Sequence, residues 1–225
     1  GISALGFMIG TGGSAFVSKT LGEGKKKLAN QYFSMLVTIA AIGGFVLSVL
    51  SFIFMRRIVM AFGAAGDLID YCTLYGRISC ISLTAFMLQN VFQSFFVAAG
   101  KPQLGLKVIV AAGCTNIVLD ALFIGVLHFG IAGAAFATMT SEFIGGLLPV
   151  VSFFRKNDSL LHFVKPVFDR RVFLKTCTNG SSELMTNLSM SLVNALYNLQ
   201  LMKIAGENGV AAYGAVCLLY TSDAA

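Results

Sequence analysis

Charged residues are scarce in this sequence of 225 amino acids. Only 12% of the residues are Asp, Glu, Lys or Arg, whereas 56% are hydrophobic, and the mean hydropathy is +0.82. A soluble globular domain carries about 25% charged residues. This chain therefore has too little polar surface for a soluble domain of its size, and the composition predicts an all-α fold, a polytopic bundle of membrane-spanning helices.

The sequence also lacks the short motifs of several kinds of active site. The five cysteines form no CxxC pair and have no histidine at metal-ligand spacing, which excludes a zinc or disulfide framework. The run Gly10-Thr-Gly-Gly-Ser14 does not belong to a GxxxxGK[ST] phosphate loop, so an ATP-driven pump is unsupported. No HExxH motif and no paired nucleophile and base are present. We expect a protein that is not an enzyme and needs no cofactor.

Long apolar runs are abundant instead. About twenty apolar residues cross the ~30 Å hydrocarbon core as a helix. The hydropathy predicts six spans and the start of a seventh, at residues 2–18, 33–55, 78–99, 104–127, 131–154, 172–202 and from Val210 onward. The residues 56–76 are amphipathic, and we expect a short helix at the membrane surface there. Because Gly1 already lies in an apolar run and the last run is short, we expect an internal fragment of a longer protein.

The basic residues lie in short clusters between these runs. The net charge of +6 invites a nucleic-acid hypothesis, but twelve Lys and Arg residues follow Ser18, Ala99 and Phe154, against three in the alternate loops. This pattern is typical of the positive-inside rule, so we expect no nucleic-acid partner and place those three loops in the cytoplasm, with the protein in the inner (cytoplasmic) membrane. The longest basic connector, 155–175, predicts a boundary between an N-terminal lobe, 1–154, and the start of a second lobe, 176–225.

Two polar residues interrupt the apolar run 106–127. Asn116 and Asp120 are four residues apart, so they share one face of a helix. A carboxylate inside a membrane span costs roughly 2.5 to 3.5 kcal/mol on insertion scales, and its default interpretation is a functional site that faces protein or water.

A second polar stripe occupies one face of the span 172–202. Its members recur at three- and four-residue steps: Asn179, Glu183, Asn187, Ser191, Asn194 and Asn198. If the helix starts near Val172, Glu183 lies about 16 Å along its axis and the stripe lines a water-filled cavity. If the helix starts near Ser181, Glu183 merely favours the positive end of the helix dipole.

Two further polar groups lie inside spans and leave both interpretations open. Glu142 follows Thr138, Thr140 and Ser141 and either pairs with a neighbouring helix or belongs to a site. Gln89, Asn90 and Gln93 are equally compatible with hydrogen bonding between helices and with a site.

Several short segments, in their order and spacing, resemble the multidrug and toxic compound extrusion (MATE) family, of a bacterial multidrug-export type. These segments are Gly10-Thr-Gly-Gly-Ser14 with Leu21-Gly-Glu-Gly24, Ala98-Ala-Gly-Lys-Pro102, Asn116-Ile-Val-Leu-Asp120, Gly130-Ile-Ala-Gly-Ala-Ala-Phe-Ala-Thr138 and Gly209-Val-Ala-Ala-Tyr213. The resemblance implies a transporter of twelve helices in two lobes, of which this chain would hold helices two to seven and the start of eight. The connector would then join the lobes.

The resemblance also implies a set of site residues. Positions matching the family's cation-coupling site in the first lobe are Asn90, Asn116, Asp120 and Thr138, while the acid of helix one would lie before Gly1. In the second lobe Glu183 matches a coupling acid, and Asn187 and Asn194 share its polar face. We expect the first four residues to form a cluster that faces a cavity, with the Glu183 stripe as its far wall.

The implied function is secondary active antiport. An amphipathic, often cationic, small molecule would leave in exchange for H⁺ or Na⁺, with Na⁺ as the possible metal ion at the coupling site, and the protein would act as a monomer in the lipid bilayer. One alternative is a lipid-linked saccharide flippase of the same broad superfamily, for which we expect more basic residues in the cavity. Another is a passive channel, which would transport without an ion gradient.

Overall fold

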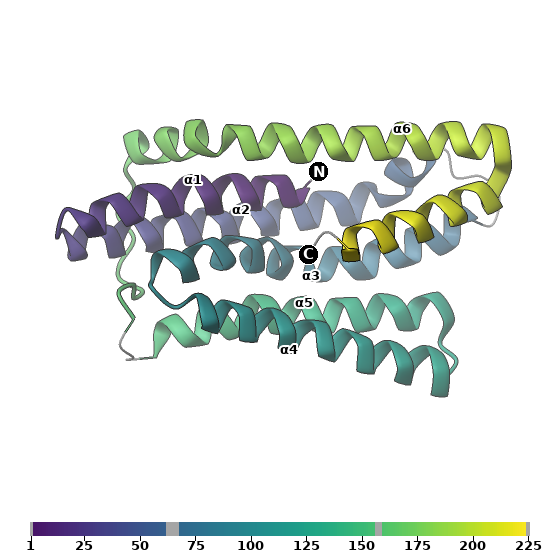
Figure 1. The fold of residues 1–225 in the computed structure, drawn as a ribbon, viewed down its shortest axis with the longest axis horizontal. Helices are drawn as coiled ribbons and strands as arrows, with labels where there is room; N and C mark the ends of the chain where they lie inside the picture. The colour runs from purple at the N-terminus through teal and green to yellow at the C-terminus, as the bar shows by residue number, and fades with distance from the viewer. Residues whose placement is uncertain (1, 62–67, 156–158, 224–225) are drawn as a thin grey trace.

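Helices make up the ordered architecture of the chain. The computed structural model describes residues 2–61, 68–155 and 159–223. Their elements are α1 (Ile2–Gly22), α2 (Lys26–Ala61), α3 (Leu68–Ala98), α4 (Pro102–Asp120), the π-helix η1 (Ala121–Val126), α5 (Gly130–Phe154) and α6 (Arg170–Asp223) (Figure 1). Within these ranges no strand occurs, and the predicted all-α fold is confirmed.

The helices occur in the order of the predicted spans, but two of the six complete spans, 2–18 and 172–202, are not among the described helices that have the length and hydropathy of a membrane span. Four stretches are long and apolar enough to cross a membrane: Lys26–Met60, Ile69–Ala98, Pro102–Val126 and Gly130–Phe154. The helix α6 contains both the sixth predicted span and the start of the seventh. The two parts meet at a bend at Gly206, whose φ of 62° lies outside the helical region. Beyond the bend, the ring of Tyr213 stacks on that of Tyr197 with a centroid separation of 5.6 Å, so the last segment folds back along α6 (Figure 1).

The described parts of the amphipathic segment 56–76 belong to the two neighbouring helices. Residues 56–61 continue α2 and residues 68–76 begin α3, so the prediction of a short surface helix is wrong for the part of the segment that the structure describes, and 62–67 lie outside it. Tertiary contacts explain the longer helices. The Met55 sulfur occupies the space beside Gly76, where an added Cβ would lie only 2.5 Å away, and the Arg77 guanidinium lies 5.5 Å from the centroid of the Phe52 ring.

The helix α3 is the centre of the bundle and contacts α1, α2 and α5. Two glycines of α5 allow a close contact with α3. An added Cβ on Gly146 would lie 2.4 Å from the carbonyl oxygen of Ala85, and one on Gly145 would lie 2.4 Å from Oε1 of Gln89. Small residues allow membrane helices to approach this closely. The backbone distance between α3 and α5 therefore depends on glycine at these positions.

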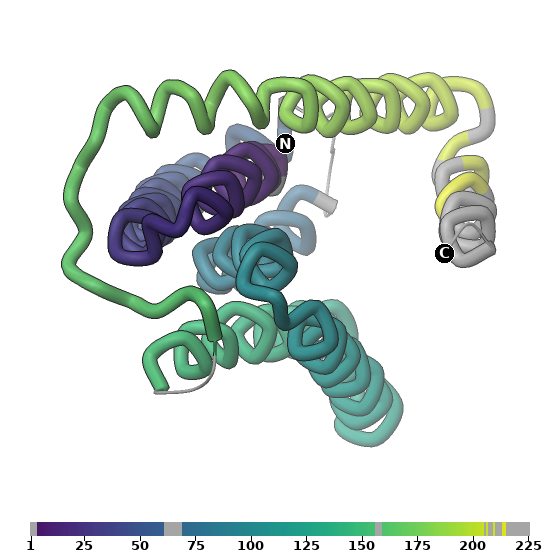
Figure 2. Tube along the Cα trace, turned by 60° about the vertical axis from the view of Figure 1, so that its left-hand side comes forward, coloured from purple at the N-terminus to yellow at the C-terminus, as the bar shows by residue number. Residues whose placement is uncertain are grey.

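The helix α6 packs against α1 through a second pair of glycines. A Cβ added on Gly12 would lie 2.2 Å from the carbonyl oxygen of Thr176, and a Cβ added on Gly180 would lie 2.1 Å from the carbonyl oxygen of Met8. Figure 2 shows the consequence: α6 runs beside α1 on one side of the bundle, while α4 and α5 lie on the other.

The connector between α5 and α6 is packed over one end of the bundle (Figure 2). The backbone N–H of His162 donates to Oδ1 of Asn30 at 2.9 Å, and the N–H of Val164 donates to the Ser34 hydroxyl at 2.9 Å. The ring of Phe163 lies 5.0 Å from that of Phe33. These contacts attach the described part of the connector, from residue 159 onward, to α2.

The start of α6 is set by an N-terminal cap. The Asp169 carboxylate accepts hydrogen bonds from the N–H groups of Arg171 at 2.8 Å and Val172 at 3.4 Å, as expected for an N-cap residue. The helix therefore begins at Arg170, inside the predicted connector 155–175. The division into two lobes stays a prediction.

A glycine substitution tests the close contact of α3 and α5. In the full-length protein, Gly146→Leu should lower the free energy of unfolding by about 1–3 kcal/mol or more, because the side chain must displace backbone. The matched control is Gly43→Leu, since no described atom outside its own stretch of helix lies within 4 Å of a Cβ added there. Thermal unfolding in detergent measures both variants, and equal melting temperatures would contradict the assignment.

Candidate functional site

A cavity of about 280 Å³ lies between α3, α4 and α5. Its lining combines polar side chains with apolar ones. The polar members are Gln89, Asn116, Thr138, Ser141 and Glu142, and the other members are Phe86, Ile109, Ala112 and Gly113. Because α4 and α5 belong to the stretches with the hydropathy of membrane spans, these oxygen-bearing groups are gathered inside an apolar layer.

Glu142 is the acidic group of this cavity. Its carboxylate accepts a hydrogen bond from the hydroxyl of Ser82, which is fully buried on α3. The bond connects α3 to α5 one turn from the close contact at Gly145 and Gly146. The structure thus joins the two interpretations that the sequence left open, because Glu142 both pairs with a neighbouring helix and lines a cavity.

Asn116 and Thr138 meet at this cavity from facing helices. The hydroxyl of Ser141 donates to the Thr138 carbonyl at 2.8 Å, so its proton is used within α5. The cavity therefore brings together two of the four predicted coupling residues, one amide and one hydroxyl.

Asp120 lies one turn beyond Asn116 and is not among the described lining residues. Its Oδ1 atom is buried and has no hydrogen-bond partner among the described residues. Asp120 is also the last residue of α4 before the π-helix η1, in which the N–H of Leu127 bonds the carbonyl of Leu122 at 2.9 Å. Stretches of π-helix are rare and occur frequently at functional sites.

Asn90 faces a different neighbour. It is 6% exposed, and its Cβ lies 3.5 Å from a Cβ added on Gly6 of α1. Its Nδ2 donates to the carbonyl of Phe86 in its own helix at 3.1 Å. The expected single cluster of four residues is therefore not formed in this structure, since Asn90 is directed toward α1. The parts of the four residues in ion coupling stay predictions.

The polar stripe of α6 is separate from the cavity. Asn187 Nδ2 donates to the Glu183 carbonyl at 2.9 Å and lies 3.4 Å from its carboxylate, and the Tyr213 hydroxyl donates to Asn194 Oδ1 at 3.3 Å. None of the described stripe residues lines the cavity, because the Gly12 and Gly180 contacts hold α6 against α1. This cavity therefore does not have the Glu183 stripe as its far wall, and the parts of Glu183, Asn187 and Asn194 in ion coupling stay predictions.

The same geometry decides between the two interpretations of Glu183. Because α6 begins at Arg170, Glu183 lies well inside the helix, and the alternative of a helix that starts near Ser181 is wrong. Glu183 is an exposed residue on α6 here.

Sequence reasoning underrated the α5 side of the cavity. Thr138, Ser141 and Glu142 are three and four residues apart, and Gly145 continues the same face. That spacing is the signal that could have identified Glu142, together with Gln89 opposite, as part of the same site as Asn116.

Comparison with known proteins gives concordant matches. The MatE family model matches residues 1–122. The multidrug export protein MepA of Staphylococcus haemolyticus (strain JCSC1435) is 27% identical over 215 residues, which cover 95% of this chain and 47% of that protein. The MepA of Staphylococcus aureus (strain MSSA476) is 24% identical over 219 residues, with the same coverage of 95% and 47%.

Solved structures share the fold. An inward-facing multidrug resistance MATE family transporter of the MOP superfamily superposes with a TM-score of 0.87 at 25% identity, over 94% of this chain and 49% of that one. An outward-facing transporter of the same description gives a TM-score of 0.84 at 24% identity, over 98% and 49%. The chain thus spans about half the length of the relatives that it matches.

The two environments of Asn116 and Asn90 can be distinguished by thiol labelling. In a full-length variant without native cysteines, Asn116→Cys should react with a small charged thiol reagent at least about tenfold faster than Asn90→Cys, because Asn116 lines the cavity between α3, α4 and α5 whereas Asn90 is 6% exposed and packs against α1. Mass spectrometry of the labelled protein measures the rates. Equal rates would show that the cavity is closed to water or that Asn90 is not packed against α1.

Proposed function

The chain belongs to the MatE family, as its motifs predicted, and on this premise we propose that the full-length protein is a secondary active antiporter. It exports amphipathic, often cationic, compounds across the cell membrane in exchange for H⁺ or Na⁺. The name of the MepA relatives, multidrug export proteins, supports the export of drug-like small molecules. Transport of this kind needs no catalytic residue and no cofactor.

The observation that carries the proposal is the cavity between α3, α4 and α5. It places one carboxylate, two amides and two hydroxyls inside an apolar layer, and carboxylate, carbonyl and hydroxyl oxygens suit hard cations such as Na⁺. A carboxylate also serves as a proton carrier. None of the described lining residues is basic. This favours a cationic cargo over the anionic headgroup that a lipid-linked saccharide flippase would handle.

In the proposed mechanism, Asp120 and the cavity residues load a coupling cation from one side of the membrane. An acid in this place can do so because its affinity for a proton or Na⁺ changes with solvation, which alternates as the transporter opens to each side. The buried Oδ1 of Asp120, which has no hydrogen-bond partner among the described residues, can accept a proton or bind a cation. The π-helical turn that follows Asp120 offers a place where α4 can change its winding.

The basic loops support an orientation. The α1–α2 turn, the α3–α4 turn and the connector lie at the same end of the bundle, since Gly100 approaches Leu160 and Asn30 bonds His162. Because Lys and Arg are concentrated there, we assign this end to the cytoplasm.

Asp120→Asn tests the proposed coupling. In the full-length protein, this variant should abolish dye efflux driven by a pH or Na⁺ gradient, because an amide cannot take up a proton. Its expression in the membrane should stay intact. The matched control is Asp70→Asn, an exposed carboxylate in the first turn of α3, which should keep wild-type efflux. Wild-type efflux from Asp120→Asn would remove Asp120 from the mechanism.

Glu142→Gln separates a transport role from a purely structural one. The glutamine oxygen can still accept the hydrogen bond from Ser82, so the variant should keep its melting temperature. Its efflux of cationic dyes should fall by about tenfold or more, because the cavity loses its charge. Efflux equal to that of the wild type would show that Glu142 only connects α3 and α5.

A further inference from the structure

A second cavity, of about 250 Å³, lies at the end of α1 that carries the turn to α2. Three places in the chain contribute to it: the last turns of α1, the beginning of α2, and α6. The charged and aromatic lining residues are Phe16, Lys19, Glu23, Lys25, Tyr32 and Lys175. The proposed transport mechanism uses none of these residues, so this cavity is a separate candidate site.

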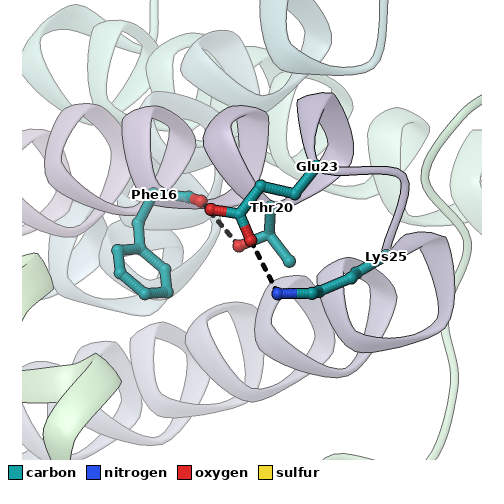
Figure 3. Close-up of polar contacts among 4 residues, drawn as sticks. All are labelled: Phe16, Thr20, Glu23 and Lys25. Carbon is teal, nitrogen blue, oxygen red and sulfur yellow. Dashed lines mark hydrogen bonds and ion pairs between the residues drawn. The ribbon is translucent and has the colours of Figure 1, made fainter.

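The cavity carries an excess of positive charge. Lys25 and Glu23 form a salt bridge with an Nζ to Oε2 distance of 2.8 Å (Figure 3), and the hydrogen bond lowers the pKa of Glu23 and raises that of Lys25. Lys19 and Lys175 form no salt bridge among the described residues. The described lining therefore has three ammonium groups and one carboxylate, and Lys19 is close enough to Glu23 to add to the lowering of its pKa.

One of these ammonium groups lies beside an aromatic ring. The Nζ of Lys175 lies 6.0 Å from the centroid of the Phe16 ring, at the distance of a cation–π interaction. The Phe16 ring in turn lies 5.6 Å from that of Tyr32. The Thr20 hydroxyl is used within α1, where it donates to the Phe16 carbonyl at 3.0 Å (Figure 3). The Lys175 ammonium group thus lies beside the ring that lines the cavity.

The position of the cavity matches that of lipid phosphates. Lys19 directly follows the apolar part of α1, and Lys175 follows the buried Val172 by one helical turn. Lysines and aromatic rings at the ends of apolar helices lie at the level of the lipid headgroups. The exposed side chains of Phe168 and Leu174, 67% and 53% exposed, provide apolar surface for acyl chains at the same end.

We propose that this cavity binds the phosphate of an anionic phospholipid, with Lys19 and Lys175 as its charged ligands and the Tyr32 hydroxyl as a neutral donor. A headgroup that carries its own cation, such as phosphocholine, would bring a positive charge toward these lysines and is disfavoured. Basic pockets between membrane helices bind anionic headgroups in this way.

The test uses the full-length protein in detergent and native mass spectrometry, with dioctanoyl phosphatidylglycerol as the probe. This lipid should bind more tightly than dioctanoyl phosphatidylcholine. Lys19→Gln and Lys175→Gln should each weaken its binding about fivefold, whereas Glu23→Gln should strengthen it by removing the only described acid of the cavity. The matched control is Lys27→Gln, an exposed lysine in the same region that does not line the cavity, and its affinity should be unchanged.

Three results would overturn the proposal. Equal weakening by Lys27→Gln would show general attraction to surface charge instead of a site. Binding of inorganic phosphate as tight as that of the lipid would show a soluble anion as the ligand. Equal affinity for both lipids would show that the acyl chains alone are recognised.

Discussion

The backbone contact of α3 with α5 at Ala85 and Gly146 is the constraint on which the rest of the bundle depends. In a bilayer, helices gain little from the hydrophobic effect on association, so close packing and interhelical hydrogen bonds must hold them. The contact places Gln89 against Gly145 and Ser82 against Glu142. Because α4 packs on α5, the same contact fixes the third wall of the cavity that holds Asn116.

The sequence predicts the helices well and their faces poorly. Apolar runs define the spans because about twenty such residues are needed to cross the bilayer, but tertiary contacts such as that of Met55 with Gly76 lengthen α2 and α3 beyond them. The sequence does not predict toward which neighbouring helix the Asn90 side chain is directed. The helix α3 is buried against α1, α2 and α5, so its apolar residues show no single stripe that would indicate a direction.

Part of the candidate site was predictable from the sequence. Asn116 and Asp120 stand out because the rest of their helix is apolar, and Thr138 came from the family resemblance. The hydrogen bond from Ser82 to Glu142 joins residues sixty positions apart, and only the fold brings them together. The Glu183 stripe was expected opposite the cavity, but the contact of Gly12 with Gly180 packs α6 against α1. No local sequence pattern specifies this pairing of helices.

Proteoliposomes that contain the full-length protein test most directly whether cargo movement is coupled to an ion gradient. The measurement follows a cationic dye with and without an imposed H⁺ or Na⁺ gradient. We predict that the dye accumulates against its own gradient only while one of the ion gradients is present. Dye movement that proceeds at the same rate without any ion gradient, and never against the dye gradient, would contradict antiport and indicate a passive channel.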